Sequence, residues 1–263
     1  MTQPQAREQE LSTQRRILET VLKDYGSSVI ALSGGVDSAT LAVLSHLALG
    51  ERSLAVTGIS ASVSAHQKTL VKRVLRAHPM PHEWIVTEEL ASEAYRENKA
   101  DRCFHCKNVL YGRLRQLADQ RGFAMVLDGT NADDLADVRP GRQAATQLGV
   151  QSPLLECGVG KEAVRALARE LHLPVAEEPA SACLASRVPP LLQISADILA
   201  QIDASEDVLR RLGFSACRVR HHGELARIEL PPEQIERALN PVIGERLAER
   251  LGRLGYRLSL IHI

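Results

Sequence analysis

Short apolar runs that suit β-strands alternate with amphipathic stretches that suit α-helices through the first two thirds of this chain. The strands are expected at residues 28–32, 54–59, 83–86, 125–127 and 151–155. The helices, whose apolar residues recur at helical spacing, are expected at 12–24, 38–49, 65–77, 107–120 and 161–171. Such alternation is typical of a parallel sheet with helices on both faces. The sequence therefore predicts a doubly wound α/β fold.

A joint rich in Pro, Ala and Ser runs from Pro179 to Pro190 and is the best candidate for a domain boundary. Beyond it we expect a small α/β module with a helix at 196–212, strands at 217–220 and 226–230, and a helix at 232–239.

We expect a first domain over residues 1–185 and a second, smaller one over 186–257. Residues 258–263 match the translation of a common sequencing-library adapter, so we treat them as a non-native tail. On that interpretation the second domain lacks its last strand.

Composition restricts the class of partner. Lys plus Arg and Asp plus Glu both number 32, so no net charge attracts nucleic acid or anionic lipid. No apolar run approaches the ~18 residues of a membrane span, and the N-terminal residues do not resemble a signal peptide. The 5 cysteines are an odd number, which favours thiols or ligands over a disulfide framework. We therefore expect a cytoplasmic protein that acts on a small molecule, with neither nucleic acid nor membrane as a partner.

A glycine-rich segment, Ser33-Gly34-Gly35-Val36-Asp37-Ser38, directly follows the first expected strand and precedes the next helix. Glycine permits a tight turn and lets backbone amides approach a phosphate, while the helix N-terminus adds partial positive charge. The segment lacks the Gly-Lys-Ser/Thr ending of the loop that serves γ-phosphate chemistry. It predicts an anion-binding turn in which Ser33 and Ser38 donate hydrogen bonds; the structural alternative is a plain strand-to-helix turn with a capping serine.

Three cysteines form a second pattern. Cys103 and Cys106 stand three positions apart at the start of an expected helix, where two thiols can share a metal or cluster. Cys183 lies in the joint, near Arg187. Three cysteines can hold three irons of a [4Fe–4S] cluster and leave the fourth iron to carry a sulfide. Alternatively, Cys183 is itself an activated nucleophile, or the three are unconnected small residues.

Cationic and polar side chains form two further candidate sites. Arg218 and Arg220 alternate on a short expected strand, so their guanidinium groups share a face that could bind anions. The alternative is a solvated charged strand. Gly129 and Asn131 follow an expected strand at its carboxyl end, where α/β sheets bind ligands. The alternative there is a helix-capping loop.

Several of these motifs together resemble a known family. Ser-Gly-Gly-x-Asp-Ser after the first strand resembles the PP-loop of ATP-pyrophosphatases, which bind the β,γ-pyrophosphate and leave the α-phosphorus open to attack. The motifs that narrow the resemblance are Arg102–Lys107, Asp128–Asp134, Arg139–Gly141, Cys183–Arg187, Arg218–Gly223 and Ala226–Glu229. Together they closely resemble the LarE family of ATP-dependent sulfur transferases, from about residue 12 to 257.

The resemblance implies an adenine nucleotide α-hydrolase-like fold with ATP and Mg²⁺ as cofactors. The family converts the carboxylates of pyridinium-3,5-biscarboxylate mononucleotide to thiocarboxylates, for the nickel-pincer cofactor of lactate racemase. Some members have one cysteine at the position of Cys183, which gives up its sulfur and becomes dehydroalanine. Others have three cysteines and bind an iron–sulfur cluster, and this chain matches that pattern. We also expect a homo-oligomer.

Residue by residue, the resemblance implies four groups of site residues. The ATP-binding residues are Ser33, Gly34, Gly35, Asp37, Ser38, Thr57, Gly129 and Asn131, with Asp37 also a ligand for Mg²⁺. The residues implied to bind the substrate's phosphate and carboxylates are Arg187, Arg218 and Arg220, with Arg139 as a further candidate. For Arg187 and Arg139 the alternative is an ordinary structural salt bridge. The implied catalytic residues are Cys183 and Glu206. The implied ligands of a [4Fe–4S] cluster are Cys103, Cys106 and Cys183.

Two departures from the family pattern bear on substrate contacts. Glu178 stands where a basic residue is usual, and Pro190-Leu191 where Tyr-Gly is usual. Two other functions stay open. A PP-loop tRNA thiolase is disfavoured by the neutral net charge, and an amide-forming or purely nucleotide-binding PP-loop protein would not need Cys183.

Overall fold

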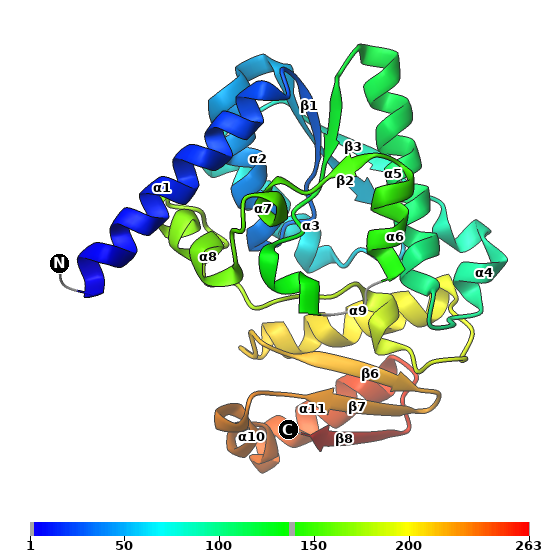
Figure 1. Ribbon diagram of the computed structural model, residues 1–263. Coiled ribbons are helices and arrows are strands. Elements are labelled where there is room, and N and C mark those ends of the chain that lie inside the picture. The colour runs from blue at the N-terminus through cyan, green and yellow to red at the C-terminus, as the bar shows by residue number, and fades with distance from the viewer. Residues whose placement is uncertain (1–2, 137–139, 263) are drawn as a thin grey trace. The chain divides into compact units, whose positions relative to one another are not determined.

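The computed structural model describes residues 3–136 and 140–262, which fold into two compact units (Figure 1). The first unit comprises residues 1–60, 67–89 and 103–180. The second comprises residues 61–66, 90–102 and 181–263. The segments 61–66 and 90–102 therefore belong to the second unit, although they precede the boundary expected at residues 185/186.

A five-stranded parallel sheet organises the first unit. Its strands are β1 (Ser28–Ala31), β2 (Ser53–Ile59), β3 (His82–Val86), β4 (Met125–Leu127) and β5 (Val150–Gln151). They lie in the order β3-β2-β1-β4-β5, with Ile30 of β1 paired to Ala55 on one side and Leu127 on the other. The winding direction thus reverses between β1 and β4, where doubly wound sheets form their ligand crevice.

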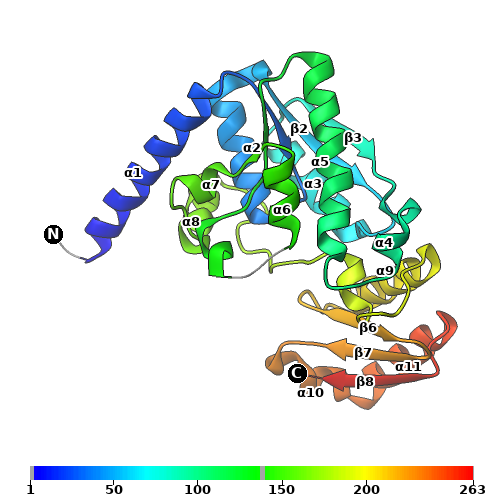
Figure 2. The same ribbon diagram turned by 45° about the vertical axis from the view of Figure 1, so that its right-hand side comes forward.

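Helices cover both faces of this sheet (Figure 1 and Figure 2). Their bounds are α1 (Gln3–Asp24), α2 (Val36–Leu49), α3 (Ala65–Ala77), α5 (Arg102–Arg121), α6 (Pro140–Gln147), α7 (Pro153–Glu156) and α8 (Lys161–Glu170). Successive residues of β1 point to opposite faces: Val29 packs with α5 and α6, and Ile30 packs with α1, α2 and α8. The expected doubly wound α/β fold is confirmed.

Two sequence-based expectations in the first unit need correction. Residues 151–155 are not a strand, because only Val150–Gln151 pairs with β4 and Pro153–Glu156 forms the helical turn α7. Proline lacks the N–H that a central strand must donate, and its fixed φ suits the first turn of a helix. The helix α6 over Pro140–Gln147 was not expected from the sequence.

The second unit has its own small sheet and core. Its strands are β6 (Arg218–His222), β7 (Leu225–Glu229) and β8 (Leu258–His262), and its helices are α4 (Glu93–Arg96), α9 (Ala196–Arg211), α10 (Pro232–Leu239) and α11 (Pro241–Arg253). β7 pairs antiparallel with β6 and parallel with β8. The expectation that this unit lacks its last strand is therefore wrong in this structure, because residues 258–262 extend the sheet.

The apolar face of this sheet packs against helices. Val219, Ala226 and Ile228 point into a core completed by α9, α10 and α11. The opposite face carries the charged residues of β6 and β7. Short 3₁₀-helices lie at η1 (Gly50–Arg52), η2 (Glu89–Ala91), η3 (Ala132–Ala136) and η4 (Leu184–Arg187).

Within the described part of the chain, no helix combines the length and the apolar composition needed to cross a membrane.

Replacing Leu44 with Ala should destabilise the first unit, because Leu44 is fully buried between α2 and its neighbours. We expect the free energy of unfolding to fall by about 2–5 kcal/mol, measured by urea denaturation. Leu47 on the same helix is 61% exposed, so Leu47→Ala is a matched control expected to stay within about 0.5 kcal/mol of the wild type. Equal losses in both variants would contradict the assigned core.

Candidate functional site

The glycine turn lies between β1 and α2, at the point where the sheet's winding reverses. Gly34 has a φ of +85°, which favours glycine, and a Cβ there would come within 2.9 Å of the carbonyl oxygen of Gln67. Gly35 differs, because its φ is −76° and a Cβ would meet only Ser33 Oγ at 3.7 Å. Neither the backbone conformation nor the packing of the described residues therefore requires a glycine at Gly35.

Ser38 closes the turn from inside. Its Oγ accepts a hydrogen bond from the backbone N–H of Ser33 at 3.1 Å and donates one to the carbonyl of Gly35 at 3.1 Å. The hydroxyl of Ser33 lies 3.0 Å from Ser38 Oγ. Gly35 gives α2 no side-chain cap, so the first-turn N–H groups of the helix are available to an anion.

The loop after β4 approaches this turn closely. A Cβ at Gly129 would lie 2.8 Å from the backbone nitrogen of Ser38 and 2.9 Å from its Cα. Only glycine therefore allows the carboxyl end of β4 to pack against the first turn of α2. This contact brings the two sequence-predicted segments, residues 33–38 and 128–134, together in the first unit.

A closed ring of four side chains connects these segments to the start of α8. Asn131 Nδ2 donates to Asp37 Oδ1 at 3.1 Å, and Lys161 Nζ forms an ion pair with Asp37 Oδ2 at 2.5 Å. Asp133 completes the ring, because its backbone N–H donates to Asn131 Oδ1 and its Oδ2 accepts from the backbone N–H of Lys161. The ring fixes three backbone segments around the glycine turn.

Sequence reasoning missed Lys161 and Asp133. Their partners are distant in the chain: Lys161 is 124 positions from Asp37, and Asp133 is 28 positions from Lys161. One local signal was present. A lysine in the first turn of a helix opposes the helix dipole, which favours acidic side chains there. Lys161 at the start of α8, directly after Gly160, is such a residue.

Below the ring, a buried carboxylate shapes the loop after β4. Asp128 accepts hydrogen bonds from the Thr130 backbone N–H at 3.1 Å, Ser152 Oγ at 2.7 Å and Tyr111 Oη at 2.5 Å. Burial, together with the neighbouring Asp128 carboxylate, raises the pKa of Tyr111, so its phenol stays protonated and donates. The network holds Gly129 in place from behind.

Thr57 supports the glycine turn from β2. Its Oγ1 donates to the carbonyl of Leu32, the last residue before the turn, at 2.8 Å. Nε2 of His82 lies 2.9 Å from the same hydroxyl oxygen. Burial lowers the pKa of His82, which favours the neutral ring at pH 7. With its hydrogen given to Leu32, Thr57 accepts from an Nε2–H tautomer.

The paired cysteines begin α5 in the first unit. Cys103 is exposed and Cys106 is half-buried, and residues three apart on a helix share a face. Cys183 belongs to the second unit. In the described residues, no three His, Cys, Asp or Glu side chains gather closely enough to hold a metal ion.

Cys183 directly precedes η4 and is half-buried. Its carbonyl accepts hydrogen bonds from the backbone N–H and the Oγ of Ser186, the latter at 2.8 Å. Arg187 is only 3% exposed and forms an ion pair with Glu206, whose exposed fraction is 0%. Both residues were expected at the site, and both lie within the second unit's interior.

Arg218 and Arg220 share the charged face of β6, while Val219 and His221 between and beside them are buried. Nε of Arg220 pairs with Glu229 Oε1 at 2.5 Å, and Arg227 Nη2 pairs with the same oxygen at 2.9 Å.

Arg227 was not expected as a site residue. Its cross-strand pairing with Arg220 places it on the same face. Burial opposes ionisation of Glu229, but hydrogen bonds and charge from Arg220 and Arg227 lower its pKa overall. The face therefore carries three guanidinium groups and one ionised carboxylate.

Three further residues were singled out in the sequence. Arg139 lies outside the described residues. Glu178 is half-buried in the first unit. Leu191 is 76% exposed and has a φ of +68°, a conformation that strains a leucine and that a glycine adopts freely.

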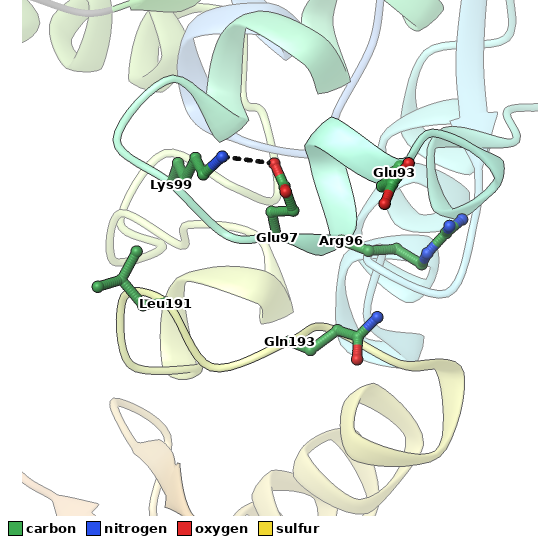
Figure 3. A pocket seen from close by; sticks show the side chains of 6 residues that line it. All are labelled: Glu93, Arg96, Glu97, Lys99, Leu191 and Gln193. Atoms are coloured by element: carbon green, nitrogen blue, oxygen red, sulfur yellow. Dashed lines mark ion pairs between the residues drawn. The ribbon is translucent and has the colours of Figure 1, made fainter.

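A shallow pocket of about 320 Å³ lies in the second unit (Figure 3). Its lining comprises Glu93, Arg96, Glu97, Lys99, Leu191 and Gln193. Lys99 and Glu97 pair with each other across its edge at 2.8 Å. The pocket includes none of the residues expected at the site.

Known proteins resemble this chain over most of its length, although no protein-family model matches it. An uncharacterised protein of Synechocystis is 38% identical over 242 residues, 91% of this chain and 90% of that protein. The pyridinium-3,5-bisthiocarboxylic acid mononucleotide synthase of Lactiplantibacillus plantarum is 34% identical over 248 residues, 94% of this chain and 89% of that protein. A subunit of the glutamine-hydrolysing GMP synthase of Sulfurisphaera tokodaii is 28% identical over 170 residues, 57% of this chain and 44% of that protein.

Replacing Gly129 with Ala should weaken anion binding at the glycine turn, because its Cβ would collide with the backbone of Ser38. We expect the Kd for inorganic pyrophosphate, measured by calorimetry, to rise about tenfold or more, since the loop and α2 must separate. Gly112→Ala in α5 is the control, because a Cβ there meets nothing within 4 Å. Unchanged pyrophosphate binding by the Gly129 variant would contradict the assigned site.

Proposed function

We propose that this chain, which belongs to the LarE family of pyridinium-3,5-bisthiocarboxylic acid mononucleotide synthases, is an ATP-dependent sulfur transferase. The observation that carries the proposal is the 34% identity over 94% of the chain, which takes in both the unit with the glycine turn and the unit with Cys183. The substrate would be the mononucleotide with two carboxylates on its pyridinium ring. The products would be thiocarboxylates for the nickel-pincer cofactor.

The first step in this proposal is adenylation. Mg·ATP binds as the substrate with its pyrophosphate against the turn of Ser33–Ser38, where the first-turn amides of α2 donate to it. A carboxylate oxygen of the mononucleotide attacks the α-phosphorus, and the bond to the bridging oxygen breaks. Pyrophosphate leaves, and the carboxylate becomes an acyl-adenylate with AMP as its leaving group. The ammonium of Lys161, beside the turn, balances charge on the departing pyrophosphate.

Asp37 has a different role in this proposal from that of a metal ligand. Both of its carboxylate oxygens already accept, one from Asn131 and the other from Lys161. Asp37 therefore orients these two side chains toward the nucleotide. Magnesium enters with ATP as part of the substrate.

The second step is sulfur transfer, for which the family implies two routes. In the first route, Cys183 supplies its own sulfur. Its thiolate attacks the activated carbonyl carbon and AMP leaves, which gives a thioester. A base then removes the Cα proton of Cys183 and the Cβ–S bond breaks. The thiocarboxylate departs with the sulfur, and the cysteine becomes dehydroalanine. Thiolate is suited to the attack because it is strongly nucleophilic near neutral pH.

Cys103, Cys106 and Cys183 would hold a [4Fe–4S] cluster in the other sulfur route implied by the family. Such a cluster would supply a bound sulfide and spare the cysteine. Cys103 and Cys106 suit this role, because both are accessible on one face of α5. Cys183 is needed in either route.

The charged face of β6 and β7 would bind the mononucleotide's phosphate. Arg218, Arg220 and Arg227 supply the cationic groups, and Glu229 holds two of them in place. We further propose a cytoplasmic, homo-oligomeric enzyme without a nucleic-acid partner.

Changing Cys183 to Ser should separate the two steps. With ATP and the mononucleotide, we expect the variant to consume ATP and release pyrophosphate as the wild type does, but to form no thiocarboxylate, because AMP stays bound in the acyl-adenylate. Chromatography of nucleotides and mass spectrometry of the acceptor measure the two products. Release of ADP and orthophosphate by the wild type would refute the assignment of the glycine turn.

The same assay distinguishes the rival functions. Sulfur incorporated into tRNA, with binding that weakens linearly in log affinity with log salt, would indicate a tRNA thiolase. AMP release with ammonia as acceptor and no dependence on Cys183 would indicate an amide-forming enzyme. The likeness to the GMP synthase subunit covers only 57% of the chain, so we assign the sulfur step instead.

Changing Cys103 and Cys106 together to Ser should decide the sulfur route. After anaerobic reconstitution with iron and sulfide, we expect the wild type to bind iron and absorb visible light, and the double variant to lose both signals. The wild type should then form more than one thiocarboxylate per chain. A colourless wild type whose intact mass falls by one hydrogen sulfide per chain, lost from Cys183, would contradict the cluster and support the sacrificial route.

A further inference from the structure

Glu206 of α9 is a carboxylate with an exposed fraction of 0%. Its Oε1 accepts from Arg187 Nε at 2.9 Å and from the backbone N–H of Val219 at 3.2 Å. Its Oε2 accepts from Arg210 Nη2 at 2.8 Å. A buried charge must be paired and hydrogen-bonded, and these three donors meet that requirement.

Arg187 connects this carboxylate to the loop that carries Cys183. Its Nη1 donates to the carbonyl of Ala182 at 2.8 Å, to the carbonyl of Cys183 at 3.2 Å and to Ser186 Oγ at 2.9 Å. The carbonyl of Cys183 also accepts from the backbone N–H and the Oγ of Ser186. The peptide that follows the Cys183 Cα is therefore fixed by three donors.

We propose that Glu206 is a positioning residue, which acts through Arg187 to fix the backbone of Cys183 and does not itself touch the substrate. The inference rests on the proposed function, because it assigns a purpose to Cys183. It differs from the family's implied catalytic acid, since both carboxylate oxygens of Glu206 accept from donors of this chain and the residue is fully buried. Arg187 donates through Nε to Glu206 and through Nη1 to the loop, so it positions the cysteine. Phosphate binding is then assigned to the charged face of β6 and β7.

The geometry explains why a buried ion pair stands here. Such pairs add little stability compared with apolar residues of the same size, because desolvation cancels much of the attraction. A guanidinium, however, offers a rigid fork that can meet a carboxylate on one side and backbone carbonyls on the other. Sulfur attack on the acyl-adenylate needs the thiolate within a narrow range of positions, which a fixed backbone supplies.

Arg210 provides a matched comparison. It pairs with the same carboxylate, from one turn further along α9. Among the hydrogen bonds of the described residues, it makes none to the loop of Cys183. Loss of either arginine disturbs the buried charge, but only loss of Arg187 releases the cysteine.

The experiment compares Arg187→Lys with Arg210→Lys, each of which keeps a positive charge beside Glu206. We expect Arg187→Lys to slow single-turnover thiocarboxylate formation, and the AMP release that accompanies it, roughly 10- to 100-fold and to leave pyrophosphate release unchanged. Iodoacetamide should alkylate Cys183 faster in this variant, as followed by peptide mass spectrometry. Arg210→Lys should match the wild type in both measurements. Equal effects of the two substitutions would overturn the proposal, because they would show a merely structural ion pair.

The pH dependence of the sulfur-transfer rate in Glu206→Gln also tests whether Glu206 acts by positioning. We expect the sulfur step to slow as in Arg187→Lys, while the pH profile of the rate keeps its shape. Loss of one limb of that profile would show general acid–base catalysis by Glu206 and overturn the proposal. If this variant fails to fold, the two lysine variants decide. Alkylation of Cys183 does not depend on enzymatic turnover. It therefore tests the positioning of the cysteine even if the wild type makes no thiocarboxylate. That last result would contradict the proposed function alone.

Discussion

The approach of the loop after β4 to the first turn of α2 is the contact on which the proposed nucleotide site depends. It requires a glycine at Gly129, because any side chain would collide with the backbone of Ser38. Once the two segments meet, Asp37 and Asn131 come within hydrogen-bonding distance, and Lys161 joins them from α8. The resulting ring holds these segments together without a ligand. Anion binding therefore need not lose the conformational entropy of ordering them.

In the second unit a carboxylate of the protein, that of Glu206, orders the surrounding donors. Glu206 gathers two guanidinium groups and a backbone N–H, much as a phosphate would, and the order it creates extends to the cysteine loop. Each unit therefore holds a set of charged side chains in fixed positions beside a proposed functional segment. Preorganised charges are effective in catalysis because they need no reorientation when the reaction occurs.

The parts of the fold that depend on local patterns could be predicted from the sequence. The glycine turn, its flanking strand and helix, and the alternation of Arg218 and Arg220 follow from the spacing of nearby residues. The ion pair of Lys161 could not be predicted, because its partner Asp37 is 124 positions away, and the full burial of Glu206 leaves no local pattern in the sequence. The strand expected at 151–155 failed where Pro153 favours a helical turn. The sequence shows the type and charge of each side chain, but it does not show which charged side chains are buried.

The segments 61–66 and 90–102 connect the two units in an unusual way. Counting the boundaries at 60/61, 66/67, 89/90, 102/103 and 180/181, the polypeptide passes from one unit to the other five times. Neither unit is a continuous stretch of chain that could be expressed, exchanged or lost alone. Insertion or deletion near any crossing alters both units at once, so recombination cannot pair this nucleotide site with a different sulfur-bearing module by a single exchange.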